Sequence, residues 1–125
     1  MDLIALPDNA PPLVRGYGDG GFRIGATRFE SAVLVTPQGV AALDLTGLDG
    51  LNGSLAAGIA ALDPRPDVLL MGTGTDMKPP PPAFTEALRQ AGIALEHMAT
   101  GPACRTFNVL MLDGRSIAAV LLPVP

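Results

Sequence analysis

The first stretch of this sequence whose residue types could bind a ligand is "VLLMGTGTDM", residues 68–77. Closely spaced glycines can leave backbone N–H groups free to hold an anion, and Gly72 and Gly74 fit that geometry. A dinucleotide fingerprint needs a third glycine where Met77 stands, and a P-loop needs a Gly-Lys-Ser/Thr ending that is absent. Two interpretations therefore stay open: a weak anion cradle, or a strand-to-helix bend in which glycine supplies a positive φ. We favour the bend, with the prolines 79–82 as a rigid spacer.

The second such stretch is "MATGPACRTFN", residues 98–108. If Gly101 caps a helix, Cys104 occupies the third helical position, where the helix dipole and Arg105 would favour a thiolate. A nucleophilic thiolate also needs a base, and His97 is the single imidazole of the chain. The alternative is a small, packed and inert cysteine. No orienting acid accompanies the pair in a known motif, so we predict that Cys104 is not a catalytic nucleophile and name no catalytic residue.

Both loops follow a predicted strand and precede a predicted helix. In a parallel sheet they would emerge at the same carboxyl edge, where open α/β sheets bind ligands. The predicted ligand-binding residues of this shared crevice are Gly72, Thr73, Gly74, Thr75, Thr100, Arg105 and Asn108. For Arg105 and Asn108 the alternative is capping and hydrogen bonding between elements. Asp76 and Lys78 are expected to lie in a solvent-exposed turn. The sequence has no pair of carboxylates at useful helical spacing, so it gives no support to hydrolysis by acid–base catalysis.

The composition of the chain excludes several other kinds of site. One cysteine and one histidine among 125 residues exclude an internal disulfide and a Cys/His metal cage, so we predict no metal and no cofactor. The net charge is −4, and the 8 basic residues form no cluster in the sequence, which argues against a nucleic-acid partner. No apolar run is long enough to span a membrane, and no signal peptide is visible, so we expect a soluble cytoplasmic protein.

The predicted elements that position the two loops change in character along the chain. The first half alternates short β-prone pieces with glycine turns, which predicts hairpin strands at 22–24, 28–29, 33–35 and 40–43. From residue 48 the pattern becomes helical, with Ser54 as a plausible cap. The predicted succession is a helix over 48–62, a buried strand at 68–71, a helix over 84–91, a strand at 93–98, a helix capped by Thr100 or Gly101, and a strand at 116–122.

This alternation predicts an α/β fold: one three-layer domain, residues 1–125, with a mixed central sheet and N-terminal hairpins before alternating helices and strands. Residues 1–15 are expected to form an extended lead-in, because prolines interrupt them. Their apolar side chains have no obvious strand partner. They would either pack across an interface, in a homo-oligomer or with a partner protein, or fold back over their own core.

The segments "GYGDGGFRIGATRFESAVLVTP", "DVLLMGTGT" and "GIALEHMATGPACRTFNVLMLDGRSIAAVL" resemble, in this order, a small α/β domain family of unknown biochemical function. The family includes a mitochondrial assembly factor of respiratory complex I and an animal relative linked to adipogenesis. The most specific part is the run Ala103–Asn108 with Gly114-Arg115 after it. Ala99 departs from the acidic or small polar residue that relatives often have there.

The resemblance implies a three-layer fold around a mixed sheet and supplies no catalytic residues. It favours a non-catalytic protein-interaction or assembly module. The alternative is a domain, or an uncharacterised enzyme, that binds a small anionic ligand at loops 72–76 and 100–105.

Overall fold

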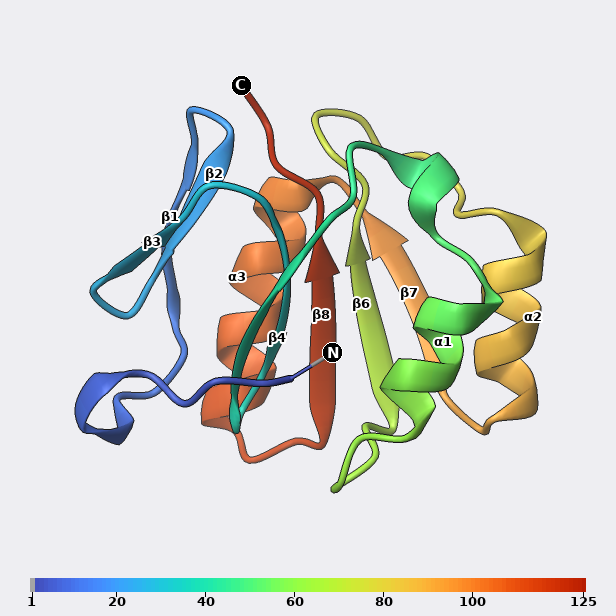
Figure 1. The fold of residues 1–125 in the computed structure, drawn as a ribbon, viewed down its shortest axis with the longest axis horizontal. Helices are drawn as coiled ribbons and strands as arrows, with labels where there is room; N and C mark the ends of the chain where they lie inside the picture. The colour runs from blue at the N-terminus through green and yellow to red at the C-terminus, as the bar shows by residue number, and fades with distance from the viewer. Residues whose placement is uncertain (1) are drawn as a thin grey trace.

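A computed structural model describes residues 2–125, so the first residue of the predicted lead-in lies outside the described part of the chain. Figure 1 shows the arrangement of the elements. Their order is 3-10 helix Pro7–Asn9, β1 Val14–Gly18, β2 Gly21–Ile24, β3 Thr27–Phe29, β4 Ala32–Thr36, β5 Gly39–Leu43, 3-10 helix Leu48–Gly50, α1 Gly53–Ala60, β6 Val68–Gly72, α2 Pro82–Gln90, β7 Ala94–Met98, α3 Thr100–Leu112 and β8 Ile117–Leu121. The α/β class predicted from the sequence is confirmed.

The main sheet has five strands in the order β5-β4-β8-β6-β7 and is mixed, as predicted. Strand β6 pairs in parallel with both β7 and β8, whereas β4 pairs antiparallel with β5 and β8. Strands β6 and β8 are central, and their near-continuous apolar sequences suit burial on both faces. A second sheet, β1-β2-β3, is a small antiparallel meander beside the main one.

Two separate hydrophobic clusters place the main sheet between two layers. On one face, Ile59 of α1 and Phe84 of α2 pack against Leu69 of β6. On the other face, Phe107 of α3 and Phe22 of the small sheet pack with Leu70. Neighbouring residues of a strand point to opposite faces, which is why Leu69 and Leu70 belong to different clusters. The three-layer prediction is therefore confirmed (Figure 1).

The N-terminal lead-in differs from the prediction because it finds partners within its own chain. Ile4 forms an antiparallel bridge with Val40, and Leu6 is buried. Strand β1 begins at Val14, inside the region expected to be extended and unpaired, and it pairs with β2. The segment folds back over its own core, as the second of the two sequence interpretations had it.

Two predicted helix caps are wrong. Asn52, not Ser54, caps α1, since its Oδ1 accepts a hydrogen bond from the Leu55 N–H at 2.9 Å. Helix α3 already includes Thr100, and its N-cap position is Ala99, which has no capping side chain. Cys104 is therefore the fifth residue of α3 rather than the third, which places it beyond the first turn, where the helix dipole acts most strongly.

Candidate functional site

The two loops singled out in the sequence do meet at one edge of the main sheet. Strands β6 and β7 are parallel neighbours, with Gly72 opposite Met98 at their carboxyl ends. The Thr73 N–H donates to the Met98 carbonyl at 2.8 Å, and the Thr100 N–H donates to the Gly74 carbonyl at 2.9 Å. The chain segments after both strands are thus hydrogen-bonded to each other. We call this region the carboxyl edge.

The hydroxyl of Thr73 holds the loop that follows it. Its Oγ1 donates to the Asp76 carbonyl at 2.6 Å and accepts from the Lys78 N–H at 3.1 Å. The residue is only 6% exposed. Both hydrogen-bonding capacities of the hydroxyl are engaged, so it shapes the turn into α2.

The hydroxyl of Thr100 joins three segments at once. It accepts a hydrogen bond from the Gly74 N–H at 2.9 Å and donates one to the Leu122 carbonyl, beyond β8, at 2.7 Å. Thr100 is 0% exposed. Because a buried polar group without a partner is costly, this hydroxyl satisfies two backbone groups that would otherwise be unpaired.

The two glycines of the first loop serve different geometric needs. A Cβ on Gly72 would lie 3.0 Å from the Leu121 side chain and 3.1 Å from Thr100 Oγ1, so this position needs a small residue for close packing. Gly74 has a φ of +98° with open space around it, so its requirement is conformational. The geometry agrees with the favoured interpretation of a strand-to-helix bend.

A hollow of about 420 Å³ lies at the carboxyl edge. Its lining contains no charged side chain and consists of Tyr17, Gly74, Thr75, Ala99, Gly101, Pro102, Val124 and Pro125. Gly101 allows the small sheet to approach, since a Cβ there would lie 2.5 Å from the Tyr17 hydroxyl oxygen. Of the seven predicted ligand-binding residues, Gly74 and Thr75 line this hollow.

Gly72, Thr73 and Thr100 lie beside the hollow at the carboxyl edge, whereas Arg105 and Asn108 lie further along α3. Arg105 is exposed on α3 and makes no hydrogen bond or ion pair within residues 2–125. Asn108 lies two turns into α3 and is bound to β1: its Oδ1 accepts from the Val14 N–H, and its Nδ2 donates to the Val14 carbonyl, both at 2.9 Å. Asn108 therefore joins α3 to β1, which is the alternative to ligand binding that the sequence left open for this residue.

Cys104 and His97 lie on opposite faces of the main sheet. His97 is in register with Met71, whose side chain belongs to the cluster under α1 and α2, and residues opposite each other on paired strands share a face. Cys104 belongs to the cluster on the α3 side. Burial raises the pKa of the Cys104 thiol to about 12, which opposes thiolate formation at neutral pH. The imidazole is therefore not placed to act as a base for this thiol.

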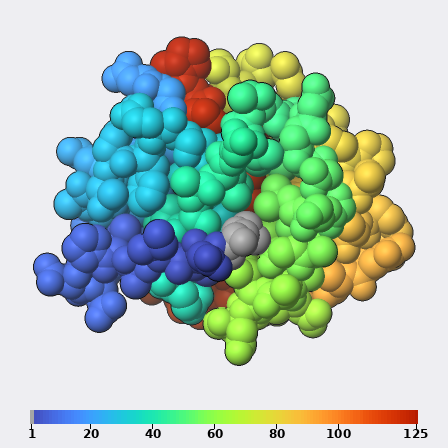
Figure 2. All heavy atoms as spheres, in the orientation of Figure 1, coloured from blue at the N-terminus to red at the C-terminus, as the bar shows by residue number. Residues whose placement is uncertain are grey.

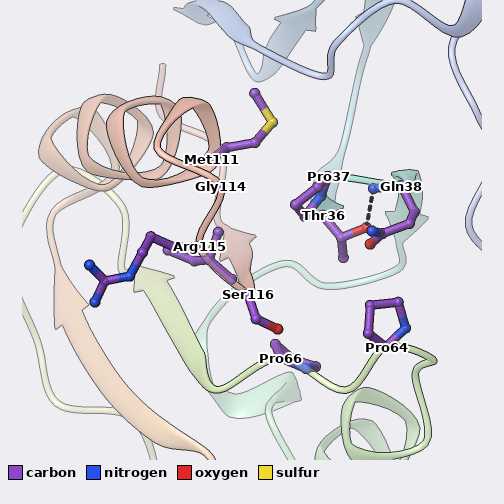
Figure 3. A pocket seen from close by; sticks show the side chains of 10 residues that line it. Thr36, Pro37, Gln38, Pro64, Pro66, Met111, Gly114, Arg115 and Ser116 are labelled. Carbon is purple, nitrogen blue, oxygen red and sulfur yellow. Dashed lines mark hydrogen bonds between the residues drawn. The ribbon is translucent and has the colours of Figure 1, made fainter.

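A second hollow, of about 290 Å³, lies at the opposite end of the main sheet, near the start of β8 (Figure 3). Pro37, Pro64 and Pro66 give it an apolar wall, with Met111 on the α3 side. In Figure 3 the Arg115 side chain extends away from the prolines. The hydroxyls there bind backbone, because Thr36 Oγ1 accepts from the Gln38 N–H at 3.1 Å and Ser116 Oγ donates to the Arg65 carbonyl at 3.2 Å. This hollow offers shape and apolar surface rather than reactive groups.

Sequence reasoning missed one grouping of charged side chains. Arg15, Arg23 and Arg28 are exposed on the small sheet, where Arg23 and Arg28 face each other across β2 and β3. They are separated in the sequence by 8 and 5 positions, so no run of charge reveals them. The sequence signal for an exposed arginine was the alternation within β2, where Phe22 and Ile24 are buried and Arg23 between them points outward.

Within residues 2–125, no group of three or more metal-ligating side chains comes together. No helix in that range is long and apolar enough to cross a membrane.

Comparisons with known proteins complete the description of the site. Residues 14–122 match a family model described as a protein of unknown function (DUF498/DUF598). An uncharacterised protein of Rhodobacter capsulatus is 37% identical over 112 residues, which cover 90% of this chain and 85% of that protein. The NADH dehydrogenase [ubiquinone] 1 alpha subcomplex assembly factor 3 of Bos taurus is 30% identical over 125 residues, covering 98% of this chain and 68% of the factor.

The human assembly factor of the same name is 30% identical over 112 residues, which cover 90% of this chain and 61% of the factor. Among solved structures, a Bordetella pertussis protein described as an Mth938-like domain superposes with a TM-score of 0.78 at 32% identity. That superposition covers 98% of this chain and 92% of the other.

Proposed function

Because this chain belongs to the family of proteins of unknown function DUF498/DUF598, we propose that it is a non-catalytic protein-interaction module that assists the assembly of an NADH dehydrogenase. The observation that carries the proposal is the 30% identity, over 98% of the chain, to a protein named as an assembly factor of that enzyme. We further propose that residues 1–125 act as one domain, in the cytoplasm.

The chemistry of the described residues supports a role without catalysis. The one thiol and the one imidazole of the chain lie on opposite faces of the main sheet. The hydroxyls of Thr73 and Thr100 each donate one hydrogen bond and accept one within the carboxyl edge, so neither has a proton left to donate to a ligand. A catalytic site instead needs polar groups directed at a substrate.

A second candidate function is the binding of a small anion in the hollow at the carboxyl edge. The hollow of about 420 Å³ favours it, since residues from both predicted loops line that space. The absence of a charged side chain from the lining argues against it, because an anion would have only backbone and hydroxyl donors. Titration with inorganic phosphate, followed by the amide resonances of Gly74, Thr75 and Gly101, tests this candidate.

The assembly role is tested by deleting the gene in its native host and measuring assembled NADH dehydrogenase in the membranes. We expect less assembled enzyme and an accumulation of unassembled subunits, both reversed when the gene is restored. Unchanged amounts of assembled enzyme in the deletion strain would contradict the proposal.

A further inference from the structure

The outer surface of the small sheet gathers positive charge in an acidic protein. We call this surface, formed by Arg15, Arg23 and Arg28, the arginine face. Arg23 of β2 lies directly opposite Arg28 of β3, and both side chains are exposed. The buried neighbours of Arg23 on β2 point the other way, toward α3. The small sheet stands at one side of the molecule, as Figures 1 and 2 show.

A bulge in β1 adds the third arginine to this surface. Val14 pairs with Ile24 and Gly16 pairs with Arg23, so Arg15 is an extra residue between two successive pairs. A bulge of this kind re-aims a side chain, and here Arg15 and Arg23 line the same hollow of about 520 Å³. Gly16 has open space where a Cβ would stand, which leaves that surface uncovered.

The charges on this face differ in how far they are neutralised. Arg28 is bound to Glu30 at 2.9 Å and to the carbonyls of Gly18 and Asp19 at 3.0 Å each. Arg15 and Arg23 make no hydrogen bond or ion pair within residues 2–125. The charge of Arg28 is therefore partly neutralised within the fold, and the free positive charge of the arginine face is that of Arg15 and Arg23.

The small sheet also differs from the rest of the chain in its net charge. Residues 10–30 contain three arginines against Asp19 and Glu30, a net charge of +1 in a chain whose net charge is −4. This stretch is therefore net positive, whereas the remainder of the chain has five basic and ten acidic residues, a net charge of −5. Such asymmetry steers an oppositely charged partner to one surface.

We propose that the arginine face is the docking surface for an acidic, extended segment of a partner protein. This inference rests on the proposed function, since it names the chemistry of the partner that an interaction module would recruit. The guanidinium groups of Arg15 and Arg23 each present a planar fork of donors that fits a carboxylate. The small side chains of Ala10, Pro11 and Ala26 give the hollow between them an open floor for a peptide backbone.

The same observations make two other anionic partners less suitable. A nucleic acid needs a longer track of positive charge to neutralise successive phosphates, and the acidic remainder of the chain opposes it. An anionic membrane surface is bound by several basic residues together with inserted apolar side chains. The lining of this hollow holds two arginines and no large apolar residue.

The test is an NMR titration of the labelled protein with a synthetic peptide of alternating Glu and Ser. We expect salt-sensitive shifts confined to the amides of Arg15, Gly16, Arg23, Gly25 and Ala26. The double substitution Arg15→Gln and Arg23→Gln should weaken binding at least about tenfold. The control Arg65→Gln and Arg115→Gln removes the same charge from exposed sites elsewhere and should retain binding.

Several results would overturn the inference. These are no peptide shifts, shifts centred on another surface, equal loss in the control variant, or tighter binding of an oligonucleotide or of phosphatidylserine vesicles through the same arginines. Its failure can be separated from that of the assembly role. If the double variant restores assembled NADH dehydrogenase in the deletion strain, the arginine face is wrong and the assembly role stands. If deletion has no effect while the peptide still binds, the assembly role alone fails.

Discussion

The carboxyl edge and the arginine face are opposites in the way they use polar groups. At the carboxyl edge, the hydroxyls of Thr73 and Thr100 are buried and hydrogen-bonded to the backbone. These residues belong to the two loops that resemble ligand-binding motifs, but their side chains stabilise the fold. On the arginine face, Arg15 and Arg23 belong to no motif and stay exposed. A polar side chain can bind a partner only if its hydrogen-bonding groups are not already used within the fold. Whether it belongs to a recognisable sequence motif does not decide this. Substitutions at the first region should therefore change stability, and substitutions at the second should change binding.

The largest expected effect concerns Cys104, the residue near the carboxyl edge that most resembles a nucleophile. Burial raises its pKa from 9.0 to about 12. Because burial lowers the thiolate fraction and leaves the side chain only 2% exposed, labelling by a thiol reagent at neutral pH should be at least about a hundredfold slower than labelling of a model thiol. His97→Ala should leave the rate unchanged, because the imidazole lies on the other face of the sheet. Fast labelling that His97→Ala suppresses would restore Cys104 as a catalytic candidate.

The same raised pKa has a consequence for stability. The folded-state pKa lies above the unfolded-state value, so the unfolded chain loses its thiol proton first as pH rises. The free energy of unfolding should therefore fall between about pH 9 and pH 12, and Cys104→Ala should remove that contribution.

Thr100→Val should have the next largest effect, on the free energy of unfolding. The substitution leaves the Gly74 N–H and the Leu122 carbonyl without their hydroxyl partner in a buried site. We expect a loss of about 3 kcal/mol in urea denaturation. Thr75→Val is the matched control, since Thr75 is exposed on the loop after β6 that Thr100 contacts, and it should change stability by less than about 0.5 kcal/mol. Equal effects of the two substitutions would contradict the structural role of Thr100.

Asn108→Ala should cost about 2 kcal/mol, because both backbone groups of Val14 lose their side-chain partner. Its distinctive signature should be a larger increase of hydrogen exchange in β1 than in β6, because the side-chain hydrogen bonds of Asn108 go to Val14 of β1. Asn108→Asp keeps the acceptor for the Val14 N–H and should give an intermediate loss. If Asn108→Ala left the exchange of β1 unchanged, the side chain would be free for another role.

Gly74→Ala should have the smallest of these effects, about 1 kcal/mol, since alanine is strained at a φ of +98°. Gly53→Ala, at the first position of α1 with open space and no positive φ, is the control and should not destabilise the protein. A wild-type melting temperature for Gly74→Ala, together with lost ligand binding, would point to a chemical role for this glycine.

The sequence predicts the element types well where periodicity is strong. The apolar run at β6 and the stripe that contains Phe84 and Leu88 both lie in elements of the expected type. The meeting of the loops after β6 and β7 follows from strand direction alone, so it too could be predicted. Resemblance to the family indicated the same layered architecture.

What the sequence could not supply was the pairing of individual atoms. Thr100 and Leu122 are distant in the chain, and only the fold shows that the hydroxyl of one binds the carbonyl of the other. Strand β1 was missed because its glycine-rich sequence is typical of a turn, whereas Asn108, far along the chain, stabilises it as a strand. The bulge at Arg15 depends on the register between two strands, which the hydrophobic pattern does not fix.

The most direct test of the central claim is a complementation experiment in the deletion strain, with assembled NADH dehydrogenase as the readout. One variant carries Arg15→Gln and Arg23→Gln on the arginine face, and the other carries Thr75→Val at the hollow of the carboxyl edge. Both change exposed side chains, so both should fold, and equal unfolding free energies would verify that. We predict that the Thr75 variant restores assembly and the arginine-face variant does not. Restoration by the arginine-face variant would contradict the account, and failure of the Thr75 variant in the same experiment would move the functional surface to the carboxyl edge.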